Sequence, residues 1–349
     1  MIECRNIVKT YGNVQAVSGI SLRLYEHEFL SILGPSGCGK STLLRLIAGL
    51  EVPSQGQVFL DGQEISGRKI IVPPEHRKFS MIFQDFALFP HLNVSENIGY
   101  GAVGSKNEKQ QRVQELLELV SLTHIASKMP HQISGGEQQR IAVARALAPR
   151  PSLIMMDEPF SNLDYQLRQK LRRDIKEILK YEGVATLFVT HDQVEAITFS
   201  DRLLLMQNGE IVQEGTPSAI YHHPDTIWAS SFVGEANHLT VEWRNDTLQT
   251  PLGEFNMPSE IGSKVSILMV RPEDFKIETA SIEHSNGIVK SVEFSGSFQI
   301  VCVDLENGTT VQVSCSPHIL WNQKDPLRIK AERYLCFNSS GKRLYEFRE

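Results

Sequence analysis

Short apolar runs alternate with amphipathic stretches through the first two thirds of the chain. The run "PSLIMMDEP" (residues 151–159) is apolar until two acidic residues end it, and "ATLFVTHD" (residues 185–192) changes from apolar to polar in the same way. Such runs are typical of strands that are buried on both faces of a parallel sheet. Between them, apolar residues recur at helical spacing, at Leu167, Leu171, Ile175 and Leu179. The alternation predicts a parallel sheet with helices packed against it.

The pattern changes after "WASSFVGEANHL" (residues 228–239). From about Asn237 onward, short β-rich runs such as "KVSILMV" dominate, and turn signals such as Asn307-Gly308 separate them. We therefore expect an α/β domain over residues 1–235, with a helical subdomain at about 85–150, and a small all-β barrel over residues 236–349.

Composition narrows the classes of protein that fit. The chain has 349 residues, of which 41% are hydrophobic and 22% charged, as in ordinary globular proteins. Its net charge of −6 and the absence of a long basic run disfavour a nucleic-acid partner. No apolar run approaches the roughly 20 residues that span a bilayer, and the first ten residues hold no apolar signal region. The five cysteines lack metal-ligand spacing, so we expect reduced thiols in a cytoplasmic protein.

The stretch "GPSGCGKST" (residues 34–42) fits the phosphate-binding pattern G-x-x-x-x-G-K-[ST] in full. Glycines let the main chain aim its N–H groups at phosphate oxygens, Lys40 would reach the β and γ phosphates, and Ser41 would hold Mg²⁺. We expect ATP to contact this loop through Ser36, Gly37, Cys38, Gly39, Lys40, Ser41 and Thr42. The alternatives are a Gly-rich turn with a solvated lysine and, for Cys38, a redox role in place of that of a small filler.

Two acidic residues end the apolar run at residues 153–156. Asp157 would orient Mg²⁺, and Glu158 would polarise a water molecule against the γ-phosphate as a general base. An apolar strand that ends in acidic residues is common. The two acidic residues therefore indicate a nucleotide site only in combination with the phosphate-loop motif.

The stretch "SGGEQQRIAVARAL" (residues 134–147) begins as a capping box, in which Ser134 and Glu137 would satisfy the first N–H groups of a helix. The two glycines between them cost about 1 kcal/mol each relative to alanine, and capping alone does not require them. Bare N–H groups at a helix N-terminus suit an anion, so we expect Ser134, Gly135, Gly136 and Glu137 to contact nucleotide.

"ISGGEQ" (residues 133–138) resembles the signature of the ATP-binding-cassette (ABC) ATPases, and the order of motifs through residues 1–235 matches that family. Ile133 stands where leucine is usual, and Glu137 stands where glutamine is usual. The resemblance implies a P-loop α/β fold with a RecA-like core plus antiparallel β and helical subdomains, followed by a TOBE-like, OB-like barrel. The chain would then be an ATP hydrolase that uses ATP and Mg²⁺.

The same resemblance implies roles for residues whose types alone say little. Tyr11 looks like the aromatic residue that stacks on adenine, and His191 looks like the histidine that contacts the γ-phosphate. Gln84 resembles the glutamine that links Mg²⁺ and the attacking water to a membrane partner, and Ser161 to Asp164 resemble the loop that communicates across the dimer. Taken singly, Tyr11 would be a strand aromatic and His191 a core histidine.

A head-to-tail homodimer with two ATP molecules at its interface follows from the resemblance, as does an integral membrane permease as partner. The apolar stretch "FQDFALFPHL" (residues 83–92) is either core or a docking groove for that permease. We expect the chain at the cytoplasmic face of a bacterial inner membrane, where a periplasmic substrate-binding protein would be an indirect partner.

Several stretches, among them "VPPEHRKFSMIF" (residues 72–83), "VGEANHL" and "RPED" (Arg271 to Asp274), look like importer ATPases for ferric iron. Importers of polyamine, sulfate, sugar and phosphonate share most of them, so these cargoes stay open. Alternatives from other classes are a soluble ABC ATPase outside transport and a regulatory module without catalysis. The barrel would be regulatory, dimer-forming or inert, and His222-His223 is interpreted as a surface turn because no further ligand lies at metal spacing.

Overall fold

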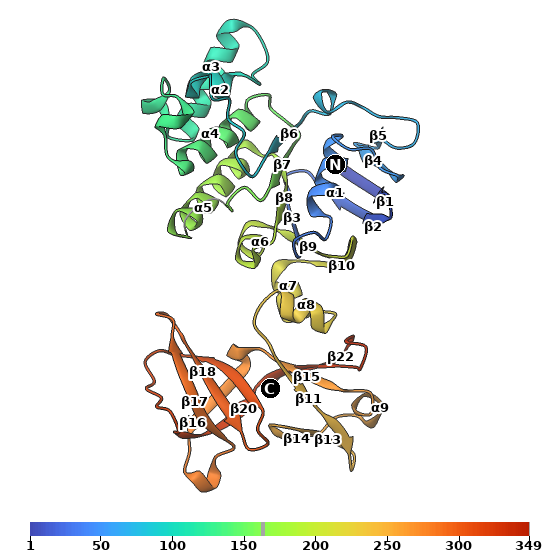
Figure 1. Ribbon diagram of the computed structural model, residues 1–349, viewed down its shortest axis with the longest axis vertical. Helices are drawn as coiled ribbons and strands as arrows, with labels where there is room; N and C mark the ends of the chain where they lie inside the picture. The colour runs from blue at the N-terminus through green and yellow to red at the C-terminus, as the bar shows by residue number, and fades with distance from the viewer. Residues whose placement is uncertain (162–164, 349) are drawn as a thin grey trace. The chain divides into compact units, whose positions relative to one another are not determined.

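The computed structural model describes residues 1–161 and 165–348. Within these residues the chain folds into two compact units, Met1–Ile220 and Tyr221–Glu349, each of which has its own core (Figure 1). The domain boundary that composition places at residues 235 and 236 stays a prediction.

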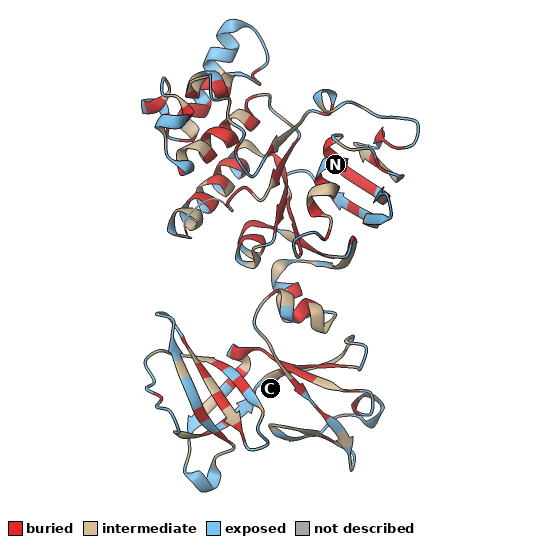
Figure 2. Ribbon diagram, viewed as in Figure 1, coloured by how far each residue is buried: buried red, intermediate tan, exposed pale blue. Residues whose placement is uncertain are grey.

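A largely parallel sheet forms the centre of the first unit, with the strand order β10-β9-β3-β8-β7-β6. Its strands are β3 (Phe29–Leu33), β6 (Phe79–Ile82), β7 (Leu153–Asp157), β8 (Ala185–Thr190), β9 (Arg202–Gln207) and β10 (Glu210–Gly215). Every residue of β3 and β8 is buried, as Figure 2 shows in red. The predicted parallel sheet is confirmed, and β10 pairs antiparallel to β9 at its edge.

Helices pack against this sheet, and three of them, which lie between β6 and β7 in the chain, form a helical part of their own (Figure 1). The helices are α1 (Lys40–Ala48), α2 (Val94–Gly99), α3 (Lys106–Leu119), α4 (Gly135–Leu147), α5 (Tyr165–Glu182) and α6 (Gln193–Phe199). Short 3-10 turns lie at Pro74–His76, Thr123–Ile125 and Pro130–Gln132. Buried apolar side chains of α2, α3, α4 and α5 form one cluster with the sheet, so the helical part shares the core of this unit.

A smaller antiparallel sheet, with the order β2-β1-β4-β5, covers the other side of α1. Its strands are β1 (Ile2–Tyr11), β2 (Val14–Leu24), β4 (Gln55–Leu60) and β5 (Gln63–Ser66). Asp61 and Gly62 join β4 to β5 with left-handed φ angles of 49° and 80°. This is the backbone that a tight hairpin needs, and it accounts for the Asp-Gly pair.

The second unit is mostly β, as predicted. Its sheets have the orders β11-β15-β21-β22, β12-β13-β14 and β16-β20-β17-β18-β19. The strands are β11 (Asn237–Thr240), β12 (Glu242–Arg244), β13 (Thr247–Thr250), β14 (Gly253–Phe255), β15 (Ile267–Val270), β16 (Phe275–Thr279), β17 (Gly287–Phe294), β18 (Gln299–Leu305), β19 (Thr310–Cys315), β20 (Pro326–Ala331), β21 (Arg333–Phe337) and β22 (Arg343–Arg348). Helix α7 (Pro217–His222) begins in the first unit and ends in the second. Helices α8 (Ile227–Phe232) and α9 (Ser259–Gly262) of the second unit are short, as are 3-10 turns at Pro272–Asp274 and Ile282–His284.

Arg271, the first residue of "RPED", is buried and binds the segment that precedes the strands of this unit. Its guanidinium donates to the main-chain oxygens of Ser230, Gly234 and Glu235 at 2.8–2.9 Å, and to that of Tyr221 at 3.0 Å. It also lies over the Tyr221 ring, 4.2 Å from the centroid. The arginine of this motif therefore has a structural role within the second unit.

Replacing Arg271 with Met should lower the free energy of unfolding of the second unit by about 2–4 kcal/mol, because buried carbonyl groups lose their donor. Trp228, Trp243 and Trp321 account for all tryptophan in the chain and belong to this unit, so their fluorescence during urea unfolding reports on it. Arg343→Met is the control, since the Arg343–Asp225 ion pair is partly exposed and should contribute less than about 1 kcal/mol. Equal losses in the two variants would contradict this role.

None of the helices in residues 1–161 and 165–348 combines the length and the apolar character needed to cross a membrane.

Candidate functional site

The residues singled out by the phosphate-loop and acidic motifs lie at one edge of the parallel sheet. Strands β3, β8, β7 and β6 are successive neighbours and all run parallel (Figure 1). The phosphate loop follows β3, His191 follows β8, Asp157 ends β7 with Glu158 next to it, and Gln84 follows β6. Open α/β sheets bind ligands at the carboxyl ends of their strands, so the strand order gathers groups that are far apart in the sequence.

Close approach of other main chain explains two of the three glycines of the phosphate loop, Gly34 and Gly39. Gly39 caps α1 with a left-handed φ of 104°, and a Cβ atom there would lie 2.1 Å from the main-chain oxygen of Ala16. A Cβ on Gly34 would lie 2.2 Å from the main-chain oxygen of Met206. The sequence does not predict the contacts with Ala16 and Met206, because both are made by main-chain oxygens, which every residue type has.

Lys40 is held inside the loop. Its side chain is buried, with 5% of the residue exposed, and Nζ donates to the oxygens of Gly34 at 2.8 Å and Pro35 at 2.9 Å. Burial of an ammonium group is costly without such partners. The alternative of a solvated lysine on a plain turn is therefore wrong. Ser36 and Gly37 are exposed at the tip of the loop.

Cys38 is buried beside Lys40, and burial raises the pKa of its thiol while the lysine charge opposes the rise. The reactive thiolate form is therefore disfavoured, which fits a small filler residue better than a redox group.

Ser41 and Asp157 meet across the sheet. Ser41 Oγ donates to Asp157 Oδ1 at 2.8 Å, although the two residues are 116 positions apart. Burial raises the pKa of the Asp157 carboxyl, and the hydrogen bond from Ser41 opposes this effect. A hydroxyl beside a carboxylate is the oxygen donor set that Mg²⁺ takes together with substrate phosphates. Within residues 1–161 and 165–348, no cluster of three or more His, Cys, Asp or Glu side chains could hold a metal by itself.

Glu158 and His191 converge next to this pair. Glu158 Oε2 lies 3.0 Å from His191 Nδ1, and the histidine side chain is half exposed. The main chain of Glu158 has a left-handed φ of 47°, a conformation that costs energy for a residue with a side chain. Hydrogen bonds hold it there, from Glu158 N to Val189 O and from Ser161 Oγ to Glu158 O, both at 3.0 Å. The main chain of Glu158 is thus fixed at the strand end, and its carboxylate lies against His191.

The Ser134 turn, residues 134–137, begins α4 as a capping box. Glu137 Oε2 accepts from Ser134 N at 2.7 Å, and Glu137 N donates to Ser134 Oγ at 3.4 Å. Ser134 Oγ also donates to Glu137 Oε2 at 2.7 Å, and this bond, together with the weaker effect of the one from Ser134 N, lowers the pKa of the Glu137 carboxyl. A Cβ on Gly136 would lie 3.1–3.2 Å from Leu167 and Leu171 of α5, so packing accounts for that glycine. Gly135 is exposed, and packing does not account for it.

The structure leaves the Ser134 turn apart from the phosphate loop. In Figure 1, α4 lies in the helical part and α1 lies beneath the antiparallel sheet, and no hydrogen bond or ion pair between described residues joins the two sites. Tyr11 lies at the end of β1, exposed, with Lys9 Nζ 4.9 Å from its ring centroid. Of the loop Ser161 to Asp164, which is predicted to communicate across the dimer, Ser161 donates to Glu158 O, and residues 162–164 lie outside the described residues.

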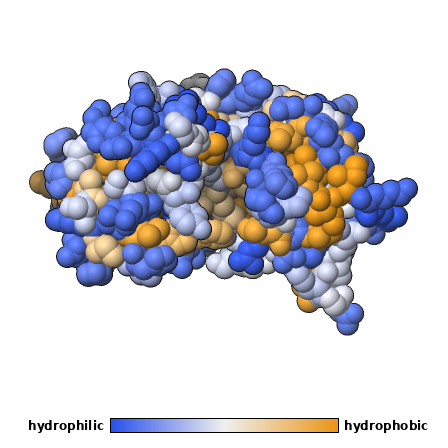
Figure 3. Space-filling view, turned by 90° about the horizontal axis from the view of Figure 1, so that it is seen from above, coloured by the Kyte–Doolittle hydropathy of each residue, from blue (hydrophilic) through white to orange (hydrophobic). Residues whose placement is uncertain are grey.

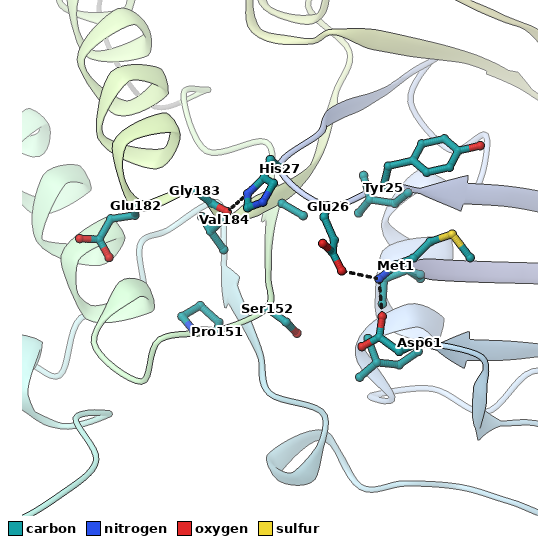
Figure 4. Close-up of a pocket in the computed structure, with 14 residues that line it drawn as sticks. Met1, Tyr25, Glu26, His27, Asp61, Pro151, Ser152, Glu182, Gly183 and Val184 are labelled. Atoms are coloured by element: carbon teal, nitrogen blue, oxygen red, sulfur yellow. Dashed lines mark hydrogen bonds and ion pairs between the residues drawn. The ribbon is translucent and has the colours of Figure 1, made fainter.

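A cavity of about 230 Å³ opens at the opposite edge of the sheet (Figure 4). Its lining includes His27, Ser152 and Gly183, which precede β3, β7 and β8. His27 Nδ1 contacts Gly183 O, as the figure shows. The cavity is therefore not part of the site at the carboxyl ends of the strands.

Comparison with known proteins gives two family matches. The ABC transporter family profile matches residues 17–161, and the TOBE domain profile matches residues 268–340. The first match contains the phosphate loop, the Ser134 turn and the two acidic residues, and the second lies in the mostly β unit.

A relative from Pectobacterium atrosepticum, described as "Fe(3+) ions import ATP-binding protein FbpC 2", is 41% identical over 311 residues, which cover 88% of this chain and 90% of the relative. The chain belongs to the ABC transporter family. A relative from Salmonella typhi, described as "Spermidine/putrescine import ATP-binding protein PotA", is 40% identical over 337 residues, which cover 92% of this chain and 87% of the relative.

A solved ABC cassette, titled "Dimeric structure of a post-hydrolysis state of the ATP-binding cassette MJ0796 bound to ADP and Pi", superposes with a TM-score of 0.54 at 34% identity. The superposition covers 62% of this chain and 99% of the cassette. Together these matches confirm the predicted family and fold class. The chain is an ABC importer ATPase with a TOBE domain, and the alternative of a soluble ABC ATPase outside transport is not supported.

Proposed function

We propose that two copies of this chain close head to tail over ATP, with the Ser134 turn of one copy completing the site of the other. The observation that carries the proposal is the convergence of Lys40, Ser41, Asp157 and Glu158 at one sheet edge, while the Ser134 turn lies elsewhere. That turn is suited to an anion but has none of the catalytic groups beside it. The solved cassette MJ0796 is described as dimeric and bound to ADP and phosphate, which supports the same arrangement here.

Each residue at the sheet edge then has a task that its position permits. The N–H groups of residues 36–42 and Lys40 bind the phosphates, and Tyr11 stacks on the adenine. Ser41, Asp157 and Gln84 would hold Mg²⁺, which supplies positive charge against the phosphate oxygens. Glu158 accepts a proton from the attacking water, and His191 contacts the γ-phosphate.

Exclusion of water strengthens each of these electrostatic contacts, so the closed dimer is the active state. Hydrolysis removes the ligand that the two copies share, and the population then shifts toward the open pair. ATP hydrolysis would thus be coupled to the opening of the dimer.

The motion would act on a membrane permease. In Figure 3 apolar side chains gather on the right, where Figure 1 draws the antiparallel strands, and the side of the helical part is mostly polar with smaller apolar areas. Near the predicted docking stretch, Phe83, Tyr100 and Val103 are exposed, the last two by 68% and 76%. Exposed apolar residues of this kind suit a helix of another protein. We place the chain at the cytoplasmic face of a bacterial inner membrane, with a periplasmic binding protein as an indirect partner.

Ferric iron is the cargo that we propose, because a relative at 41% identity is described as a ferric-ion importer. The second candidate is a polyamine, since the spermidine/putrescine relative is 40% identical over more of the chain. The genes next to that of this chain would decide between them. A two-halved permease with a periplasmic iron-binding protein would support iron, and a polyamine-binding protein in that place would overturn it.

Purified protein should release phosphate slowly from ATP in the presence of Mg²⁺, and Lys40→Ala should not, because the ammonium group that faces the phosphates is lost. Malachite-green detection of phosphate measures this directly. Absence of release above the Lys40→Ala background would contradict the hydrolytic function and favour a regulatory module without catalysis.

Pull-down from detergent-solubilised membranes tests the partner separately. We expect recovery of a polytopic membrane protein. Recovery of ribosomes without any membrane protein would contradict a role in transport.

A further inference from the structure

The main chain directly after Gln84 is strained. Phe86 and Ala87 are consecutive residues with left-handed φ angles of 61° and 45°, although neither is glycine. Side chains make this conformation rare, and two in succession need an outside contact to hold them. Phe86 is buried, and Phe86 N donates to Phe83 O at 3.0 Å, so the turn is part of the folded core.

Arg145, near the end of α4, supplies that contact. Its Nη1 donates to Ala87 O at 2.7 Å and its Nη2 to Phe86 O at 2.9 Å. The guanidinium also lies over the ring of Phe89, 5.2 Å from the centroid. The planar fork of arginine can reach both carbonyl groups at once, and the point charge of lysine cannot.

The chain on either side of this turn is also fixed. Upstream, Ile82 ends β6 and pairs with Met156 of β7, next to the acidic residues of the site. Downstream, Asn97 accepts from Phe89 N and donates to Phe89 O and Leu92 O at 2.9–3.1 Å. Gln84 therefore lies on a short span whose path depends on the strained turn held by Arg145.

We propose that Arg145 is a positioning residue, which fixes the main chain after Gln84 and thereby the Gln84 amide in the site. The inference rests on the proposed ATP hydrolysis. Arg145 belongs to the same helix that begins at the Ser134 turn, about 16 Å away at the usual helical rise. The helix that presents the Ser134 turn thus also holds the Gln84 span.

Arg145→Lys tests this by keeping the charge and removing the fork. We expect kcat for ATP hydrolysis to fall about tenfold, with the KM for ATP and the affinity for nucleotide nearly unchanged. Arg140→Lys is the matched control on the same helix, where Arg140 donates to Val120 O and pairs with Asp174. We expect Arg140→Lys to lower Tm by about as much as Arg145→Lys does, and to leave kcat close to that of the wild type.

Ala87→Gly provides a rescue that a merely structural role would not show. Glycine adopts the left-handed conformation freely, so the turn needs less help from Arg145. Added to Arg145→Lys, it should restore kcat at least about threefold, and added to Arg140→Lys it should change nothing. If Arg145→Lys does not fold, Phe89→Leu replaces it, with an expected loss of about threefold that Ala87→Gly again reverses.

Three outcomes distinguish a failure of the positioning role of Arg145 from a failure of the proposed ATP hydrolysis. Equal losses of kcat in Arg145→Lys and Arg140→Lys would overturn the positioning role, and so would the absence of rescue by Ala87→Gly. A wild-type protein that releases no more phosphate than Lys40→Ala would refute the proposed hydrolysis itself.

Discussion

Replacing Glu158 with Gln should stop turnover and leave ATP bound between two copies of the chain. The substitution keeps the size of the side chain and removes the carboxylate that accepts the proton, so hydrolysis should fall by about 10²- to 10⁴-fold. The phosphate loop and the Ser41–Asp157 pair are untouched, so nucleotide should still bind. Size-exclusion chromatography with ATP and Mg²⁺ should then show a dimer that is absent without nucleotide.

A double variant, Lys40→Ala with Glu158→Gln, is the control for this experiment. It should stay monomeric with ATP, because the shared ligand is not retained. If Glu158→Gln alone remains monomeric while it keeps bound nucleotide, the model of two copies closed over ATP is wrong.

Gly39→Ala should weaken nucleotide binding about hundredfold. The new Cβ would lie 2.1 Å from Ala16 O, and the residue would have to keep a φ of 104°. Overpacking and backbone strain each cost about 1–3 kcal/mol, which together amount to two orders of magnitude in affinity. Titration with a fluorescent ATP analogue measures the effect, and thermal unfolding checks that the variant is folded.

Gly37→Ala distinguishes backbone strain from the close contact with Ala16. Gly37 also has a left-handed φ, of 81°, but a Cβ there would meet no atom within 4 Å. We expect a loss of about tenfold or less from strain alone. If Gly37→Ala and Gly39→Ala weaken binding equally, contact with Ala16 is not what selects glycine at position 39.

Local patterns predict the elements of this fold well, because each depends on neighbouring residues. The apolar run before Asp157 is β7, the run before His191 is β8, and Asp61-Gly62 forms the hairpin between β4 and β5. The order β3-β8-β7-β6 cannot be derived from such patterns, since it depends on contacts between distant segments. That order is what brings Ser41 to Asp157 across 116 positions.

The candidate site shows the same division. The motif predicts Lys40, yet the carbonyl groups of Gly34 and Pro35 that hold it follow from the folded loop. Anion binding is not needed to explain Gly136 of the Ser134 turn, because packing against α5 requires a small residue there. Sequence periodicity places α5 but does not show which of its leucines approach α4.

Two remaining motifs of the second unit are also explained by contacts. "RPED" marks the buried Arg271 and its carbonyl partners. In the pair His222-His223, His223 Nδ1 lies 2.7 Å from Glu346 Oε2, and Arg333 Nη2 donates to His222 O at 2.8 Å. These are contacts to β21 and β22. Both histidines are exposed, as predicted, but His222 is the last residue of α7, and only His223 lies beyond the helix.

Arg271 also determines where this protein can be cut. A fragment that begins at residue 236 would remove Tyr221, Ser230, Gly234 and Glu235, whose oxygens satisfy the buried guanidinium. The guanidinium would lose these acceptors and the Tyr221 ring that covers it, and the apolar side chains of Met269, Leu335 and Phe337 would lose the packing of Ile227, so the fragment should be less stable and prone to aggregate. Expression of the β-rich half by itself should start ahead of Tyr221, even though the strands themselves begin at Asn237.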